Sequence, residues 1–240
     1  LDATSFTLDG GVFTNDGVLA FNPLLGPNGT VITVRSGGQI LGTGELLLQR
    51  DGLGSVARLE TYYTTLTHGA DHTIRGGGRI TASIDNYGLI RAHRPGDPLE
   101  LSTGNRMNYD TIEAVAGAEL HIGSGRTSQD PAGVLQADGG VVVVESSAEI
   151  HGGSFASSAG GHIEITGENS QLHNITNGGE IRISGPAQTN VYGSLTNDGD
   201  FRINYAQDDE PTRMRFVGGA VTLGGYGTIH LQTNGDRDDA

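Results

Sequence analysis

The sequence repeats itself about every 20 residues. Residues 175–183, Ile-Thr-Asn-Gly-Gly-Glu-Ile-Arg-Ile, return at 195–203 as Leu-Thr-Asn-Asp-Gly-Asp-Phe-Arg-Ile, and the same frame occurs at 13–21 and 84–92. A repeat of this length is one small structural unit that cannot bury its own apolar face, so neighbouring copies must stack on one another.

Two further sets of residues extend the pattern. A degenerate copy at 108–114 has Asp110 where the glycine stands, and Arg106 takes the place of its leading apolar residue. A second frame, apolar-x-x-x-Gly-x-apolar, occurs at 34–40 and at 74–80, which we interpret as two periods apart. Residues 223–229 share this skeleton.

The conserved positions within the frame have a direct physical meaning. Asn and Gly accept a positive φ, and an Asn side chain can hydrogen-bond the backbone two residues on, so Asn-x-Gly predicts a bend. Polar and apolar residues then alternate, as in Glu180-Ile181-Arg182-Ile183, which indicates a strand with one buried face. The predicted structural turn residues are Asn15, Gly17, Asn86, Gly88, Asn177, Gly179, Asn197 and Gly199.

These features predict an all-β fold, a right-handed parallel β-solenoid (β-helix) of roughly ten or more rungs, each of about 20 residues. An antiparallel sandwich or jelly roll is the alternative, but stacked coils explain better why one residue type returns at one offset after each period. Arg91, Arg182 and Arg202 should point outward, and Glu180 and Asp200 should offset the repulsion between the last two arginines. The residues expected in one continuous core are Leu19, Phe21, Ile90, Ile181, Ile183, Phe201 and Ile203.

Some segments depart from the repeat. Residues 55–66 have a weak helical spacing, which predicts a short helix or a bulged rung. The loops 93–98 and 207–211 are expected to leave the solenoid at its corners, where binding residues of repeat proteins concentrate. We expect one solenoid domain over residues 1–233, with 234–240 as a polar tail or the start of a linker, in a fragment of a longer protein.

Composition excludes several classes of function. With 14 basic and 28 acidic residues and a net charge of −14, the chain is a poor partner for nucleic acid. It has no cysteine for disulfides or thiolate metal sites. It also lacks the run of about 18 apolar residues that a membrane-spanning helix needs, so no membrane span is expected in this fragment.

The Asn-x-Gly bends, together with the phrases at 74–80 and 225–229, resemble the passenger domains of autotransporters and the haemagglutinin-type repeats of bacterial surface adhesins. The resemblance extends from about Phe13 to Leu231. It implies a secreted or surface-displayed right-handed β-helix with a role in cell adhesion and virulence. It supplies no catalytic residue, because such families share a scaffold rather than a site.

The functional prediction is therefore a structural or adhesive module at the bacterial cell surface or outside the cell, non-enzymatic and without catalytic, cofactor-binding or metal-binding residues. Its partner would be a surface glycan or protein of a host or neighbouring cell, or a second copy through self-association. The alternatives are a viral or phage receptor-binding spike and a carbohydrate-active enzyme, a polysaccharide lyase or hydrolase, which would use paired carboxylates. The acidic residues considered for that role are Glu113, Glu119, Glu149 and Glu164.

Histidine and tyrosine offer two weaker signals. The eight histidines are scattered, so we interpret them as solvated side chains rather than as a metal cluster. The adjacent Tyr62 and Tyr63 could stack on a sugar, but the favoured interpretation is an aromatic pair that fills an irregular rung.

Overall fold

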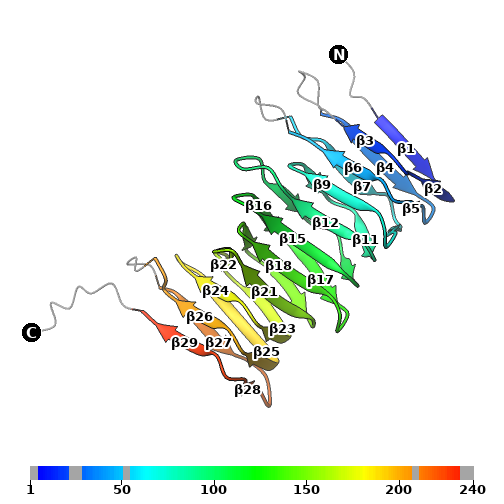
Figure 1. The fold of residues 1–240 in the computed structure, drawn as a ribbon. Coiled ribbons are helices and arrows are strands. Elements are labelled where there is room, and N and C mark those ends of the chain that lie inside the picture. The colour runs from blue at the N-terminus through cyan, green and yellow to red at the C-terminus, as the bar shows by residue number, and fades with distance from the viewer. Residues whose placement is uncertain (1–4, 22–28, 51–54, 207–210, 233–240) are drawn as a thin grey trace, which may run out of the picture.

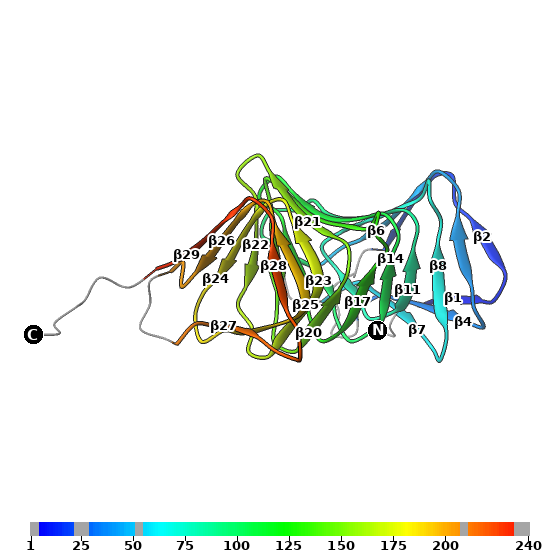
Figure 2. The same cartoon turned by 90° about the horizontal axis from the view of Figure 1, so that it is seen from below.

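The computed structural model describes residues 5–21, 29–50, 55–206 and 211–232, and these residues form strands and no helix. The strands pair in parallel to form a β-solenoid of about 9 turns, which confirms the predicted all-β solenoid. The turns are stacked from the N-terminal strands in blue to the C-terminal strands in red (Figure 1). Figure 2 shows β2 (Val12–Thr14) and β29 (Thr228–Leu231) at opposite ends of the stack.

Each turn contributes to three stacks of parallel strands, which we name faces A, B and C. Face A contains β1 (Ser5–Asp9), β4 (Val31–Arg35), β7 (Arg58–Thr61), β10 (Arg79–Ile80), β13 (Leu99–Leu101), β16 (Glu119–Ile122), β19 (Val141–Val144), β22 (His162–Ile165), β24 (Glu180–Ile183), β26 (Asp200–Ile203) and β29.

The other two faces share their longest strands. Face B contains β2, β5 (Gln39–Leu41), β8 (Thr65–His68), β11 (Ser83–Asn86), β14 (Arg106–Asn108), β17 (Gly125–Gln129), β20 (Ala148–His151), β27 (Arg213–Phe216) and the first parts of β23 (Ser170–Asn177) and β25 (Gln188–Asn197). Face C contains the second parts of β23 and β25, with β3 (Val18–Phe21), β6 (Glu45–Leu48), β9 (Thr73–Gly76), β12 (Leu89–Ala92), β15 (Thr111–Val115), β18 (Val134–Asp138), β21 (Ser154–Ser158) and β28 (Thr222–Gly224).

The alternating apolar residues of all three faces meet in one core. Side chains on successive turns lie in columns, since each strand pairs in register with the strands of the turns before and after it, as Ile181 does with Ile163 and Phe201. The prediction of the core is confirmed: five of the seven expected residues are buried, and Leu19 and Ile203 are partly buried against the same cluster. Arg91, Arg182 and Arg202 lie on the outer side of their strands, in ion pairs with carboxylates.

One sequence frame serves two different corners of the solenoid. Asn15 and Asn86 lie between faces B and C, whereas Asn177 and Asn197 lie between faces C and A. The frame thus occurs at two different bends that lead into a strand with one buried face, so equal local sequence does not mean equal position in the turn.

Two other predictions require correction: the equivalence of 34–40 with 74–80, and the helical alternative for 55–66. The segments 34–40 and 74–80 are not equivalent, because the first crosses from face A to face B and the second from face C to face A. The second does share its corner with 223–229. Residues 55–66 contain no helix; β7 and the start of β8 occupy them, and Leu59 and Leu66 are core residues. Within the described ranges, no helix is present that could cross a membrane.

Candidate partner-binding corner

The corner between faces C and A in the last turns is built on glycine. Gly179, Gly199 and Gly227 each precede a strand of face A, and the backbones of successive turns meet here. A Cβ on Gly199 would overlap the carbonyl oxygen of Gly179, and one on Gly227 would overlap that of Gly199. Only glycine fits these positions.

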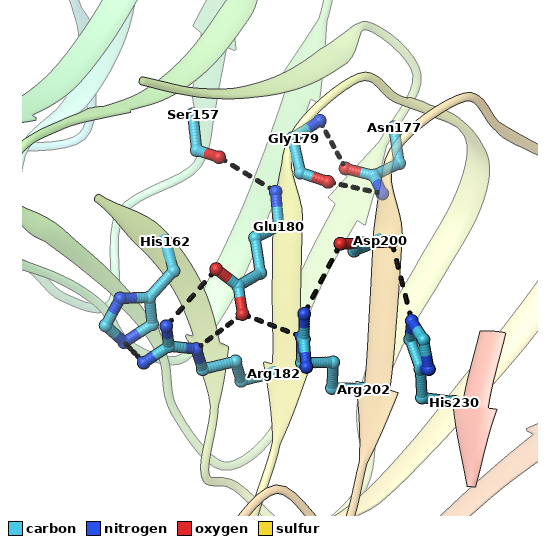
Figure 3. Close-up of polar contacts among 9 residues, drawn as sticks. All are labelled: Ser157, His162, Asn177, Gly179, Glu180, Arg182, Asp200, Arg202 and His230. Atoms are coloured by element: carbon cyan, nitrogen blue, oxygen red, sulfur yellow. Dashed lines mark hydrogen bonds and ion pairs between the residues drawn. The ribbon is translucent and has the colours of Figure 1, made fainter. Parts of the chain in front are cut away.

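Two asparagines, Asn177 and Asn197, hold this corner from inside the core, and Figure 3 shows the contacts of Asn177 with Gly179. The Asn177 side chain donates to the Gly179 carbonyl at 3.1 Å and accepts from the Gly179 amide at 3.1 Å. It also donates to Oδ1 of Asn197 at 2.7 Å, and Asn197 donates to the Thr228 carbonyl at 3.2 Å. Because the amide oxygen and nitrogen of both side chains have partners, these asparagines can occupy positions that are apolar in other turns.

A shallow polar hollow of about 450 Å³ lies on the outer side of the same corner. Glu180, Asp198 and Asp200 contribute to its lining, and Tyr226 lies at its edge with its side chain fully exposed. The Tyr226 amide donates to Oδ1 of Asp198 at 3.0 Å, which fixes the backbone that carries the ring. Sequence reasoning missed Tyr226, although its place between Gly225 and Gly227 is the tip of a bend, where a side chain must face solvent.

A cluster of ion pairs extends from this hollow across face A (Figure 3). Arg182 and Arg202 are register partners on adjacent strands, as predicted. Glu180 contacts both: its Oε1 lies 3.0 Å from Arg182 Nε and 2.9 Å from Arg202 Nε. Asp200 lies 3.5 Å from Arg202. The expected compensation is therefore confirmed, with the difference that one carboxylate, Glu180, bridges the two arginines.

The contacts within this cluster also change the pKa of Glu180 and of His162. Hydrogen bonds from Arg182 lower the pKa of Glu180, although its partial burial opposes the shift. Burial lowers the pKa of His162, and the neighbouring Arg182 acts in the same direction. Arg182 Nη1 donates to His162 Nε2 at 3.3 Å, and its guanidinium lies 4.1 Å from the centre of the Tyr205 ring. At neutral pH the cluster thus contains an ionised Glu180 and a neutral His162.

We expect replacement of Glu180 by glutamine to lower the free energy of unfolding by about 1 kcal/mol, because the two half-buried arginines then repel each other at strand spacing. Chemical denaturation measures the change. The double variant Glu180→Gln/Arg202→Gln should recover part of the loss. Glu168→Gln, a change at an exposed carboxylate that forms no ion pair among the described residues, is the matched control. Equal losses for both single variants would contradict the bridge.

The remaining predicted turn residues lie at the corner between faces B and C. The Gly17 amide donates to Oδ1 of Asn15 at 3.3 Å. Asn86 is buried and bonds to Asn108 of the next turn. A Cβ on Gly88 would overlap the carbonyl oxygen of Gly69, while nothing lies within 4 Å of the same position at Gly17.

The four acidic residues considered for catalysis do not come together. Glu113 lies on face C, where it pairs with Arg91; Glu149 lies on face B; and Glu119 and Glu164 lie on face A in strands separated by β19. Glu119 contacts His121 at 3.1 Å, and Glu149 contacts His151 at 3.6 Å.

The two predicted binding loops and the tyrosine pair have different positions. Loop 93–98 is anchored, because Pro95 bridges to Ala118 and Asp97 lies 3.3 Å from Arg50. Of loop 207–211, residues 207–210 lie outside the described residues. Tyr62 and Tyr63 do not fill a rung: both are exposed between β7 and β8, with ring centres 4.5 Å apart.

The histidines also need a correction. His68 and His72 are fully buried rather than solvated. Among the described residues, no group of three histidine or acidic side chains is arranged to hold a metal ion.

Comparison with protein families, with curated proteins and with solved structures finds no match for the chain. The resemblance to surface passengers and adhesins thus rests on the motifs alone, and the structure adds to it the parallel β-solenoid.

Proposed function

We propose that the chain is a structural and adhesive module of a bacterial secreted or surface-displayed protein, and that it binds a partner without transforming it. The observation that carries the proposal is the exposed Tyr226 ring beside a polar hollow, on a corner whose backbone is fixed by glycine and asparagine. The partner is a glycan or protein on the surface of a host or neighbouring cell.

The chemistry of the corner suits recognition. A tyrosine presents an apolar ring and a polar hydroxyl together, and it loses little conformational entropy when it is covered. The carboxylates and backbone groups of the hollow supply hydrogen-bond acceptors at one side of the ring. A rigid solenoid holds these groups in place, so binding needs little ordering of the protein.

The arrangement of carboxylates supports a non-enzymatic role. Glycoside hydrolysis uses two carboxyl groups that flank the scissile bond, one of them protonated to serve as general acid. Glu180 is bound to two arginines and its pKa is lowered, which is opposite to what a general acid requires.

The test combines binding with a search for products. We expect the protein to be retained on a surface glycan or protein and to release no new reducing or unsaturated ends from acidic or neutral polysaccharides. Tyr226→Ala should weaken retention at least about tenfold, which corresponds to about 1.4 kcal/mol. Its fold should persist, because the ring is exposed.

Tyr109→Ala is the matched control, since Tyr109 stacks on Tyr87 at a different corner. Reproducible cleavage that a single carboxylate replacement abolishes would replace this proposal with an enzymatic one. If both tyrosine variants are retained equally, the corner that carries Tyr226 is not the binding site.

A further inference from the structure

The corner between faces B and C contains a continuous chain of buried side-chain hydrogen bonds. It begins at Asn15, passes through His72 and His68, and continues to Asn86 and the turns beyond. Both imidazoles are fully buried. The successive links are Asn15 to His72 at 3.1 Å, His72 to His68 at 3.1 Å, His68 to Asn86 at 2.6 Å, Asn86 to Asn108 at 2.8 Å, Asn108 to Gln129 at 3.3 Å and Gln129 to the Gly152 carbonyl at 3.1 Å.

Every bond in this chain has the same direction. The orientation of Asn15 is fixed, because its Oδ1 accepts from the Gly17 amide and its Nδ2 donates to the Glu45 carbonyl. Its Nδ2 is therefore a donor toward His72 Nε2, which must accept. The proton of His72 is then on Nδ1 and is donated to Nε2 of His68, which in turn donates from its own Nδ1 to Oδ1 of Asn86. Both histidines are neutral and have the same tautomer.

If either histidine gains a proton, no hydrogen-bond acceptor in this series of side chains is free to receive it. A proton on His68 Nε2 would face the Nδ1 proton of His72, and a proton on His72 Nε2 would face the amide hydrogens of Asn15. Two donors then point at each other in a buried site, which costs the full desolvation of both groups.

Few charged groups near the pair could stabilise an added proton. The Glu45 carboxylate, on β6, favours the charged form of His72, whereas the ionisable group that faces His68 is His72 itself. The other neighbours of His68 are uncharged: Asn86 on β11, Ile40 on β5 and Gly88 at the corner. Burial lowers the pKa of His68 to about 4, and burial also lowers the pKa of His72, with Glu45 opposing the shift.

We propose that the His68–His72 pair is an acid-sensitive latch, which holds the corner between faces B and C closed in its neutral form and releases it on proton uptake. An opened corner returns the histidines to water, where their pKa is near 6.5. The open state therefore binds more protons than the closed state below that value. Closure is complete above pH 6.5 or so and is lost progressively as the pH falls toward about 4.

The effect should be largest in the turns that contain the pair. His151, His162 and His173 also have a pKa lowered by burial, but they are only partly buried. At the corner between faces C and A in the last turns, the buried polar side chains are Asn177 and Asn197, which do not titrate. Acid should therefore open the N-terminal turns first and leave the C-terminal turns closed. The proposal is independent of the partner-binding corner.

Hydrogen exchange followed by mass spectrometry, corrected for the intrinsic rate at each pH, tests the latch on the whole chain. Peptides that cover residues 65–76 should lose protection as the pH falls from about 6.5 to about 4.5, by up to roughly tenfold per pH unit for each proton taken up. Peptides that cover 175–203 should change little. Constant protection of 65–76 over this range would overturn the proposal.

Two variants sharpen the result. His68→Asn/His72→Asn replaces both rings by amides of the kind that Asn86 and Asn108 already provide, and the loss of protection of 65–76 in acid should become much smaller. His93, which contacts Arg75 and has a pKa lowered by burial, accounts for what remains. His121→Asn is the control: burial lowers the pKa of His121, but its hydrogen bonds with Glu119 and Glu145 outweigh this and raise it. His121 thus stabilises the fold below its unfolded pKa and loses that effect as the pH rises, so His121→Asn should leave the acid response intact.

A titration of the wild-type histidine ring signals by NMR keeps the test valid if the double variant does not fold. His68 and His72 should show the Nδ1–H tautomer at neutral pH. His68 should titrate near pH 4 and His72 below the ordinary histidine range, because protonation requires the corner to open. Titration of both rings near pH 6.5 in the folded protein would overturn the latch, as would the same loss of protection in a folded double variant.

Discussion

Replacement of Arg106 by leucine is expected to raise the free energy of unfolding by about 3 kcal/mol. Arg106 occupies a core position in β14, in one column with Ile84 before it and Thr127 after it, and only 2% of it is exposed. Its Nε donates to the Thr127 hydroxyl at 3.0 Å, but Nη1 and Nη2 have no hydrogen-bond partner within the described chain. Burial lowers the pKa of Arg106 to about 10, a direct sign of the cost of the charge there.

Leucine removes this cost, because it restores the apolar residue that the column has at Ile84 and Ile150. Chemical denaturation at neutral pH measures the gain. Arg126→Leu is the matched control: Arg126 is exposed on the next turn, where such a change should stay within about 0.5 kcal/mol. A loss of stability in Arg106→Leu that the control does not share would mean that the buried guanidinium is satisfied by a group that offsets its desolvation.

The same column shows what the repeat could and could not predict. Period and alternation were sufficient for the parallel stack and its core, because register pairing repeats the environment of each position from turn to turn. They also indicated Arg106 as an exception, since it stands where an apolar residue is expected. The energetic meaning of that exception depends on which side chains surround the guanidinium, and these come from neighbouring turns rather than from the local frame.

The corners show a different limit. Asn86 and Asn177 have the same local pattern, yet Asn86 pairs with His68 and Asn177 with Phe155, so they belong to different corners. Only the pairing between turns, which connects distant residues, distinguishes them. The burial of His68 had a local signal, because it lies two residues after Leu66 on the same side of β8. The hollow beside Tyr226 had none, because four successive turns form it.

Replacement of Gly199 by alanine is expected to lower the free energy of unfolding by about 3 kcal/mol, the upper range for a side chain forced into a packed site. The new Cβ would overlap the carbonyl oxygen and the backbone nitrogen of Gly179, so no side-chain rotation can relieve the contact. The turns would have to separate at this corner, where Asn177 and Asn197 join them. Tyr226 and the hollow should be displaced with the corner, and partner retention should fall together with stability.

Gly178→Ala, in the preceding turn of the same corner, is the matched control. Its Cβ would lie 3.8 Å from the Phe155 carbonyl oxygen, which is an ordinary contact. Since alanine restricts the unfolded chain more than glycine does, this variant should be neutral or more stable by up to about 1 kcal/mol. Thermal and chemical unfolding of the two variants decide the matter. If Gly199→Ala is as stable as Gly178→Ala, the turns are not in close backbone contact at this corner, and the rigid support assigned to Tyr226 is lost with that contact.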